Sequence, residues 1–263
     1  MGNSVIDNWM SLAAPAVLLG VGMVALIEVG RQLGLRRIRR TPAGQQSGVG
    51  AVEGAVFALF GLLIAFTFSG AGSRFDARRS LVTEEANAIG TAWLRLELLP
   101  LSAQPDLRAL FRNYLDSRLE TYRLLPDVAA ARQELTRSVE LQGQIWKKAV
   151  AAVRESSTTM AGMLLLPALN QMIDITTTRL MATRTHPPGI VFGLLVALAL
   201  AGALLAGFAM AEGKGRSWVH MLAFAAVLAT TVWITIDLEY PRLGLIRVDA
   251  ADFVLEDLRR SMD

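Results

Sequence analysis

The sequence has no cysteine and only two histidines among its 263 residues. The absence of cysteine excludes disulfide frameworks, thiolate metal sites and cysteine nucleophiles. His186 and His220 have no acidic companions at metal-ligand spacing, so we predict no metal site. No Gly-x-Ser-x-Gly elbow or phosphate-binding loop is found either. We therefore expect that the protein is not an enzyme, with no catalytic residues and no cofactor.

Charge is also scarce, at 19% of residues, and the formal net charge is only +3. The basic residues are dispersed and no nucleic-acid motif accompanies them, which predicts no nucleic-acid partner. Hydrophobic residues make up 53% of the chain. That share is too high for an ordinary soluble domain unless the apolar residues are concentrated in a few segments.

Four segments do concentrate them, and each has the ~20 residues that a helix needs to cross a bilayer. Core helices of a large soluble protein are the alternative, but four such runs are hard to bury in a chain of this length. The first run is longer than the apolar core of a signal peptide, so we keep it as a span. We predict an all-α membrane protein that lies in the lipid bilayer, with spans at about 9–29, 49–70, 189–210 and 218–236.

The predicted organisation is two pairs of transmembrane helices that flank a helical extramembrane region. No proline occurs between Pro42 and Pro100, so the second span is able to continue unbroken for roughly 70 Å, unless glycines bend it. Asp127 is expected to cap a later helix. The apolar stretch GMLLLPALNQMI leaves a short fifth span open. The expected regions are 1–70 (first pair), 71–188 (helical region), 189–236 (second pair) and 237–263 (tail).

Basic residues give only a weak indication of topology. The connector after the first span contains the run RRIRR, and Lys214 and Arg216 lie in the last connector. The positive-inside rule would place both connectors in the cytoplasm and the middle region outside. Because the opposite face carries as many flanking positive charges, the side of the middle region stays open, with a slight lean to the outside.

A polar stripe follows the second span. Glu84, Asn87, Thr91 and Arg95 recur at spacings of three and four and so share one face of a helix. An amide and a hydroxyl between charges suggest a specific hydrogen-bond network or the wall of a wet vestibule. A solvated surface, or an ion pair with a neighbouring helix, is the alternative.

The second span itself has a bulky apolar stripe. Phe60, Ile64 and Phe68 follow one another at spacings of four. A ring of such side chains is able to gate ions by excluding water. The alternative is a stripe that packs against other helices or faces lipid.

Small residues at spacings of four line two of the predicted spans. Such faces let helix backbones approach closely in lipid, either within one subunit or between subunits, and the sequence leaves both readings open. The positions are Gly50, Gly54 and Ala58 in the second span, and Gly189, Gly193, Ala197 and Ala201 in the third.

The segment LFGLLIAFTFSGAGSRFDARRSLVTEEANAIGTAWLRLELLP, together with RALFRNYLDSRL and DLEYPRLGLIRVD, resembles the bacterial bestrophin-like membrane proteins, a family of uncharacterised function. The resemblance covers most of the chain from about residue 50. The matching positions are Gly61, Phe66, Arg74, Arg78, Glu85, Ala86, Asn87, Ile89, Gly90, Thr91, Arg95, Leu99 and Pro100.

This resemblance implies a homo-oligomer in the inner (cytoplasmic) membrane that passes small inorganic ions. Bestrophins are pentameric anion channels with a neck of bulky apolar residues on the second span, which Phe60, Ile64 and Phe68 match in type and spacing. Arg78 and Glu85, from the matching segment, join the predicted vestibule residues. The chain lacks the acidic tail segment of the animal calcium clasp, so calcium gating is not implied. The arginines after the first span disagree with bestrophin topology, in which the middle region is cytosolic.

Two functions follow from these observations. The first is an oligomeric ion channel, lined by the second span and constricted at the apolar stripe. The second is a non-conducting membrane scaffold or a signalling or stress-response protein, which binds a partner through its helical middle region.

Overall fold

The computed structural model describes residues 2–40, 49–156, 159–212, 217–242 and 244–263. Over these ranges all regular structure is helical, and four helices are long and apolar enough to cross a membrane. The predicted all-α membrane fold is therefore confirmed. The helices are α1 Gly2–Arg40, α2 Val49–Arg95, η1 Leu96–Leu98, α3 Gln104–Arg123, α4 Val128–Glu155, α5 Thr159–Arg184, α6 Gly189–Ala209, η2 Met210–Glu212, α7 Trp218–Glu239, η3 Asp249–Ala251 and α8 Phe253–Arg260.

The chain divides into two compact units, and α2 contributes to both. Unit 1 comprises residues 1–73 and 186–240, and unit 2 comprises residues 74–185 and 241–263. The connector predicted at 30–48 is shorter in the structure, because α1 continues to Arg40. Residues 41–48, and Lys214 and Arg216 of the last connector, fall outside the described residues.

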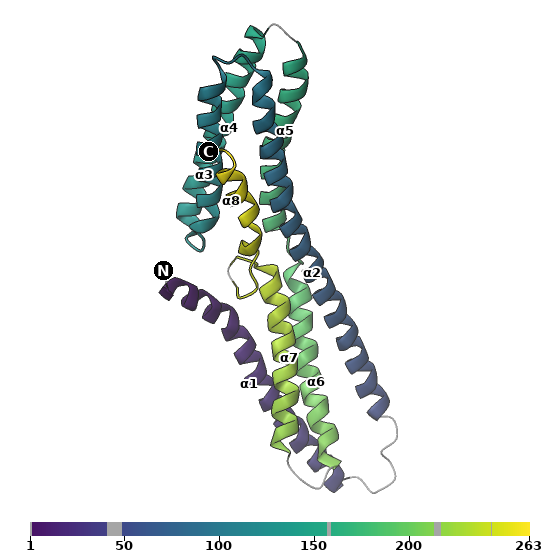
Figure 1. The fold of residues 1–263 in the computed structure, drawn as a ribbon. Coiled ribbons are helices and arrows are strands. Elements are labelled where there is room, and N and C mark those ends of the chain that lie inside the picture. Colours follow the sequence, from purple (N-terminus) through teal and green to yellow (C-terminus); the bar gives the residue numbers. More distant parts are fainter. Residues whose placement is uncertain (1, 41–48, 157–158, 213–216, 243) are drawn as a thin grey trace. The chain divides into compact units, whose positions relative to one another are not determined.

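Unit 1 is built on close packing of α1 against α6 and α7, which lie beside one another in Figure 1. Glycine allows this approach: a Cβ on Gly30 or Gly34 would overlap the α6 backbone, and one on Gly207 would overlap the carbonyl of Ile27. Small residues therefore bring these two helix backbones into contact, as expected where lipid supplies no hydrophobic drive between helices.

The first half of α2 joins unit 1 through large side chains. The Phe57 ring packs edge-on against Phe224, with centroids 6.1 Å apart, and lies over Gly202. Phe60 is buried in a cluster with Leu195 and Met221. This span is otherwise the least covered of the four, with 6% of its most apolar window buried.

Unit 2 is a helical domain with its own apolar core. The second half of α2, α3, α4, α5 and the tail helix α8 all contribute to this core. Asp127 caps α4, because its carboxylate accepts hydrogen bonds from the amides of Ala129 and Ala130 at 3.0 Å, as predicted. Leu165, from the stretch considered as a fifth span, is fully buried in this core.

The second span continues without interruption into the polar helix. α2 is one helix of 47 residues, and neither Gly70 nor Gly72 ends it. Its residues from Val49 to Arg95 therefore keep a single helical register, so positions in its apolar and polar halves can be compared directly.

Candidate functional site

The second half of α2 presents a polar outer face and an apolar inner face. Glu84, Asn87 and Thr91 are exposed, whereas Val82 and Ile89 are completely buried in the core of unit 2. The structure thus brings three of the predicted vestibule residues together on one exposed face. No hydrogen bond of these three side chains occurs within the part of the chain that the structure describes, and the face is open.

Arg95, the fourth residue of the polar stripe, is held by a hydrogen bond to another helix. Its guanidinium donates a hydrogen bond of 2.6 Å to the backbone carbonyl of Leu164 on α5. Arg78 is buried and donates to the carbonyls of Ala182 and Thr185, at 3.1 and 2.9 Å. Arg78 and Arg95, near the two ends of the polar half of α2, therefore bind α2 to α5 and to Thr185, the residue that follows α5.

The predicted constriction residues do not share one environment. Phe60 is only 3% exposed and packs inside unit 1, and Ile64 lies against the same cluster. Phe68 is 45% exposed. Counted along the helix, Phe60 and Ile64 fall on roughly the opposite side from Glu84, Asn87 and Thr91.

Other apolar residues occupy the face that continues the polar stripe. Counting back from Asn87 in steps of three and four leads through Ser80, Ser73 and Ser69 to Phe66 and Leu62. Phe66 is 69% exposed and Leu62 is 54% exposed. Steps of four from Phe60 lead to Ile64 and Phe68 and pass these two residues by, and only the register carried back from the polar half of the helix reaches them.

Next to this face, α2 presents small residues. Ala58 and Ala65 are exposed, and a Cβ added at Gly54 or Gly61 would meet nothing within 4 Å. The small residues of α6 are open in the same way, since Gly189 and Gly193 have no neighbour within 4 Å of an added Cβ. The contact between α1 and α6 uses different glycines, so the glycines of these two small-residue faces lie open among the residues that the structure describes.

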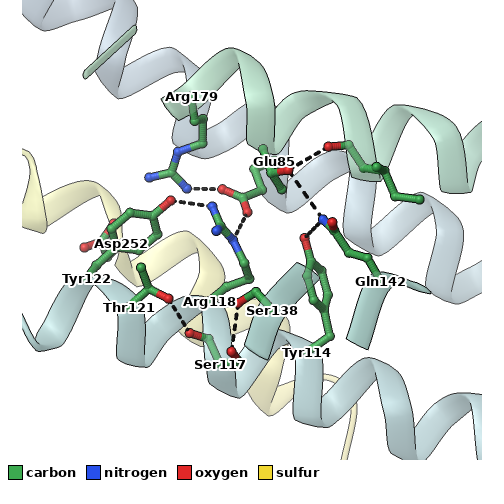
Figure 2. Close-up of polar contacts among 12 residues, drawn as sticks. Glu85, Tyr114, Ser117, Arg118, Thr121, Tyr122, Ser138, Gln142, Arg179 and Asp252 are labelled. Atoms are coloured by element: carbon green, nitrogen blue, oxygen red, sulfur yellow. Dashed lines mark hydrogen bonds and ion pairs between the residues drawn. The ribbon is translucent and has the colours of Figure 1, made fainter. Parts of the chain in front are cut away.

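A buried ion-pair network fixes the inner side of α2. Glu85 is fully buried, and Arg118 of α3 donates to its Oε1 at 2.6 Å. Arg179 of α5 donates to the other carboxylate oxygen. Figure 2 shows Glu85 between these two guanidinium groups, with Gln142 and Tyr114 joined by a 3.0 Å hydrogen bond close by.

Tyr122 connects this network to the tail. The guanidinium carbons of Arg179 and Arg242 each lie 4.3 Å from the centre of its ring, and Arg242 is paired with Asp252 at 2.7 Å. Arg118 donates to the Tyr122 hydroxyl. Helices α3 and α5 and the tail therefore meet at one aromatic ring.

Burial and charge act in opposite directions on Glu85. Burial alone would raise the pKa of its carboxyl, but the guanidinium groups of Arg118 and Arg179 outweigh that penalty and lower the pKa below its ordinary value. Burial raises the pKa of the Tyr122 hydroxyl, so it stays neutral at physiological pH. The network holds α2, α3 and α5 together, which orients the outer face of α2.

A sequence model of the bestrophin-like domain matches residues 21–253. This chain belongs to the bestrophin-like family. No curated protein matches it.

Solved structures show the same fold for this bestrophin-like chain. One crystal structure of a variant of a bacterial bestrophin homolog from Klebsiella pneumoniae gives a TM-score of 0.71 at 12% identity, covering 96% of this chain and 97% of that one. A second variant of that homolog gives 0.64 at 16% identity, covering 95% and 98%. The chain thus shares the fold of these bacterial bestrophin homologs over nearly its whole length.

Proposed function

We propose that this bestrophin-like chain forms a homo-oligomeric ion channel in the inner membrane, lined by the exposed face of α2. The observation that carries the proposal is the register of that face. Exposed Leu62 and Phe66 lie in line with exposed Glu84, Asn87 and Thr91 on one uninterrupted helix. One face of α2 thus carries both an apolar stretch, which can form a constriction, and a polar stretch, which can form a hydrated vestibule.

The small-residue face of α2 supports an arrangement around an axis. Gly54, Ala58, Gly61 and Ala65 lie beside the proposed lining face and are not covered by the subunit's own helices. A helix of the next subunit packs closely against small residues. That contact would turn the adjacent face, with Leu62 and Phe66, toward the axis.

Each part of the lining face has a distinct role in this proposal. A ring of Leu62 and Phe66 side chains forms a dry constriction, which opposes ion passage by excluding water. The hydroxyl, amide and carboxylate groups of Thr91, Asn87 and Glu84 hydrate ions in a wide vestibule. Phe60 instead supports the lining helix from behind, since it is packed in the core.

The charge on the lining face favours cations. Asp76 and Glu84 are both exposed on this side of α2, and these two carboxylates outnumber Arg95, whose guanidinium keeps its positive charge while it donates to the Leu164 carbonyl. Rings of carboxylates raise the local concentration of cations and repel anions. The resemblance to bestrophins implies anions, so the sign of the permeant ion separates the two expectations.

The test is single-channel recording of purified protein in planar bilayers. Replacement of Leu62 or Phe66 by alanine is expected to raise conductance, because a wider ring wets more easily. Phe60→Ala is the matched control, since it removes a similar side chain from the core and should lower stability without opening the pore. An unchanged conductance in both L62A and F66A contradicts the proposed lining face.

Ion selectivity is tested in the same bilayers under a sodium chloride gradient. The reversal potential should indicate a preference for sodium over chloride. Glu84→Gln should reduce that preference by about twofold or more, as expected for loss of a charge within ~8 Å of the ion path in water. A chloride-selective reversal potential would refute the assignment of the permeant ion while leaving the pore intact.

A scaffold that binds a partner is the second candidate function, and one observation favours it. Large apolar side chains are exposed where the end of α2 meets the start of α5 in unit 2, and such patches often mark protein contacts. If Ala replacements at Leu62 and Phe66 give no current or ion flux in reconstituted membranes, the scaffold is the better reading. The exposed residues are Leu94, Leu98, Leu101, Met160, Met163 and Leu164.

The orientation of the chain in the membrane needs its own measurement. The arginines in the last turns of α1 lead us to propose that unit 2 lies on the outer side, in line with the positive-inside rule. A phosphatase reporter fused after residue 130 is active only outside the cytoplasm and should therefore be active. An inactive phosphatase with an active cytoplasmic reporter at the same position places unit 2 inside.

A further inference from the structure

One face of α1 is apolar over more than the thickness of one bilayer leaflet. Its members follow one another at spacings of three and four, so they form a single stripe along the helix. From the first to the last, the stripe runs about 22 Å at ~1.5 Å per residue. The exposed residues on it are Leu18, Val21, Ala25, Val29 and Leu33.

The same face then becomes basic within one turn. Arg36, Arg39 and Arg40 follow Leu33 at helical spacing, and all three are exposed. None of them is paired with a carboxylate in the ranges that the structure describes. The acid in this part of α1, Glu28, pairs with Arg31 at 3.1 Å and accepts from Gln32 at 3.2 Å. The three guanidinium groups therefore have their charge uncompensated.

The backbone beneath these arginines is held firmly. Gly34 sits against the carbonyl of Phe208 and the side chain of Ala211, so α1 and α6 touch at this level. Arg37 is turned toward α6, with its guanidinium carbon 5.5 Å from the centre of the Phe208 ring. Arg37 thus helps to fix the end of α1, and the other three arginines point away from this contact.

We propose that Arg36, Arg39 and Arg40 bind the phosphate headgroup of an anionic phospholipid whose acyl chains lie along the apolar stripe of α1. The apolar stripe matches the acyl chains of a phospholipid, and the three arginines match its phosphate headgroup. The stripe offers apolar surface where acyl chains run, and the guanidinium groups begin where that surface ends. Arginine binds phosphate oxygens through forked hydrogen bonds.

A free anion fits this face less well than a lipid does. A soluble phosphate would use the guanidinium groups but would have no part in the apolar stripe beside them. Clusters of basic residues at the end of a membrane helix attract anionic lipid with about a fivefold gain in affinity for each residue near the surface. Three arginines together account for a preference on the order of 100-fold over a zwitterionic lipid. This inference is independent of whether the protein conducts ions.

The experiment uses the full chain reconstituted in phosphatidylcholine bilayers. Spin-labelled phosphatidylglycerol and spin-labelled phosphatidylcholine are compared, and the motionally restricted fraction of each gives the relative association constant. The wild type should prefer phosphatidylglycerol. Raising the ionic strength from 0.1 M to 1 M should weaken this preference strongly, because the Debye length falls from about 10 to 3 Å.

Variants then locate the binding face. Arg36→Gln, Arg39→Gln and Arg40→Gln combined should abolish the preference, whereas lysine at the same three positions should retain most of it. The matched control removes three exposed charges from α4 of unit 2 by Arg132→Gln, Lys147→Gln and Arg154→Gln, and should leave the preference unchanged.

Three results would overturn the proposal. The first is a wild type that shows no preference for phosphatidylglycerol at low salt. The second is a glutamine variant that keeps the wild-type preference. The third is loss of the preference when inorganic phosphate replaces chloride at equal ionic strength, since that would identify a site for free phosphate. The first and third of these results need no variant, so they decide the matter even if the glutamine variant inserts poorly.

Discussion

Replacement of Glu85 by glutamine should destabilise unit 2 severely. The change leaves the shape of the side chain almost intact but removes the negative charge between two buried guanidinium groups. Arg118 and Glu85 are 2% and 0% exposed, so water cannot solvate the charges that remain. Breaking one member of a buried ion pair costs about 3–5 kcal/mol, because an uncompensated charge stays inside the protein. For a chain of this size that loss lowers the melting temperature by roughly 10 °C.

The assay is urea unfolding of the purified chain in mild detergent, followed by tryptophan fluorescence. Trp93 is buried in the core of unit 2 and reports on its unfolding. Glu97→Gln is the matched control. Glu97 is 67% exposed and pairs with Arg108 at 3.3 Å, and an exposed pair of this kind contributes about 0–1 kcal/mol. If the E85Q variant unfolds within about 1 kcal/mol of the wild type, the network does not stabilise the fold in the way we argue.

The loss of stability in E85Q should also depend on pH, and the direction of the Glu85 pKa shift fixes how. Because the two arginines lower the pKa of Glu85 in the folded protein, its contribution to stability is fully present above the unfolded value of about 4.3. The contribution is lost as the pH falls through the lower folded value. The difference between wild type and E85Q should therefore be constant near neutral pH and shrink below about pH 4. A difference that grows in acid would contradict the assigned direction of the shift.

Three further changes test other parts of the fold, the first by size-exclusion chromatography and the other two by the same unfolding measurement. Gly207→Val should separate α1 from α6, because the added side chain overlaps the Ile27 carbonyl, and loss of the folded protein is expected on size-exclusion chromatography. Asp127→Ala removes the cap of α4 and should cost about 1 kcal/mol. Arg259→Gln breaks a 2.7 Å pair with the half-exposed Asp116 and should cost less than about 1 kcal/mol. A larger loss in R259Q would show that the tail is held mainly by this ion pair.

Much of the fold was predictable because membrane helices are specified by local chemistry. Long apolar runs predicted the four candidate spans, and the lack of proline allowed the second of them to continue into the polar helix, as it does. Asp127 was recognisable as a cap because its role depends on the amides that directly follow it. In each case the determining groups are neighbours in sequence.

The candidate site was predictable only in its polar half. The spacing of Glu84, Asn87 and Thr91 was enough to place them on one face, and the structure leaves that face exposed. The spacing of Phe60 and Ile64 was equally regular, yet they face the core. Periodicity shows which residues share a face, but it does not show what that face meets.

The sequence by itself thus determined which segments are helices, where they are apolar, and which side chains share each face, since all of these follow from nearest neighbours and helical spacing. Only the tertiary structure decided which face of α2 is covered and which is open. Only the tertiary structure, too, brought Arg118 and Arg179 to Glu85, across 33 and 94 residues of chain. The physical reason is that burial and ion pairing depend on which distant helices pack together, and a single sequence does not record that choice locally.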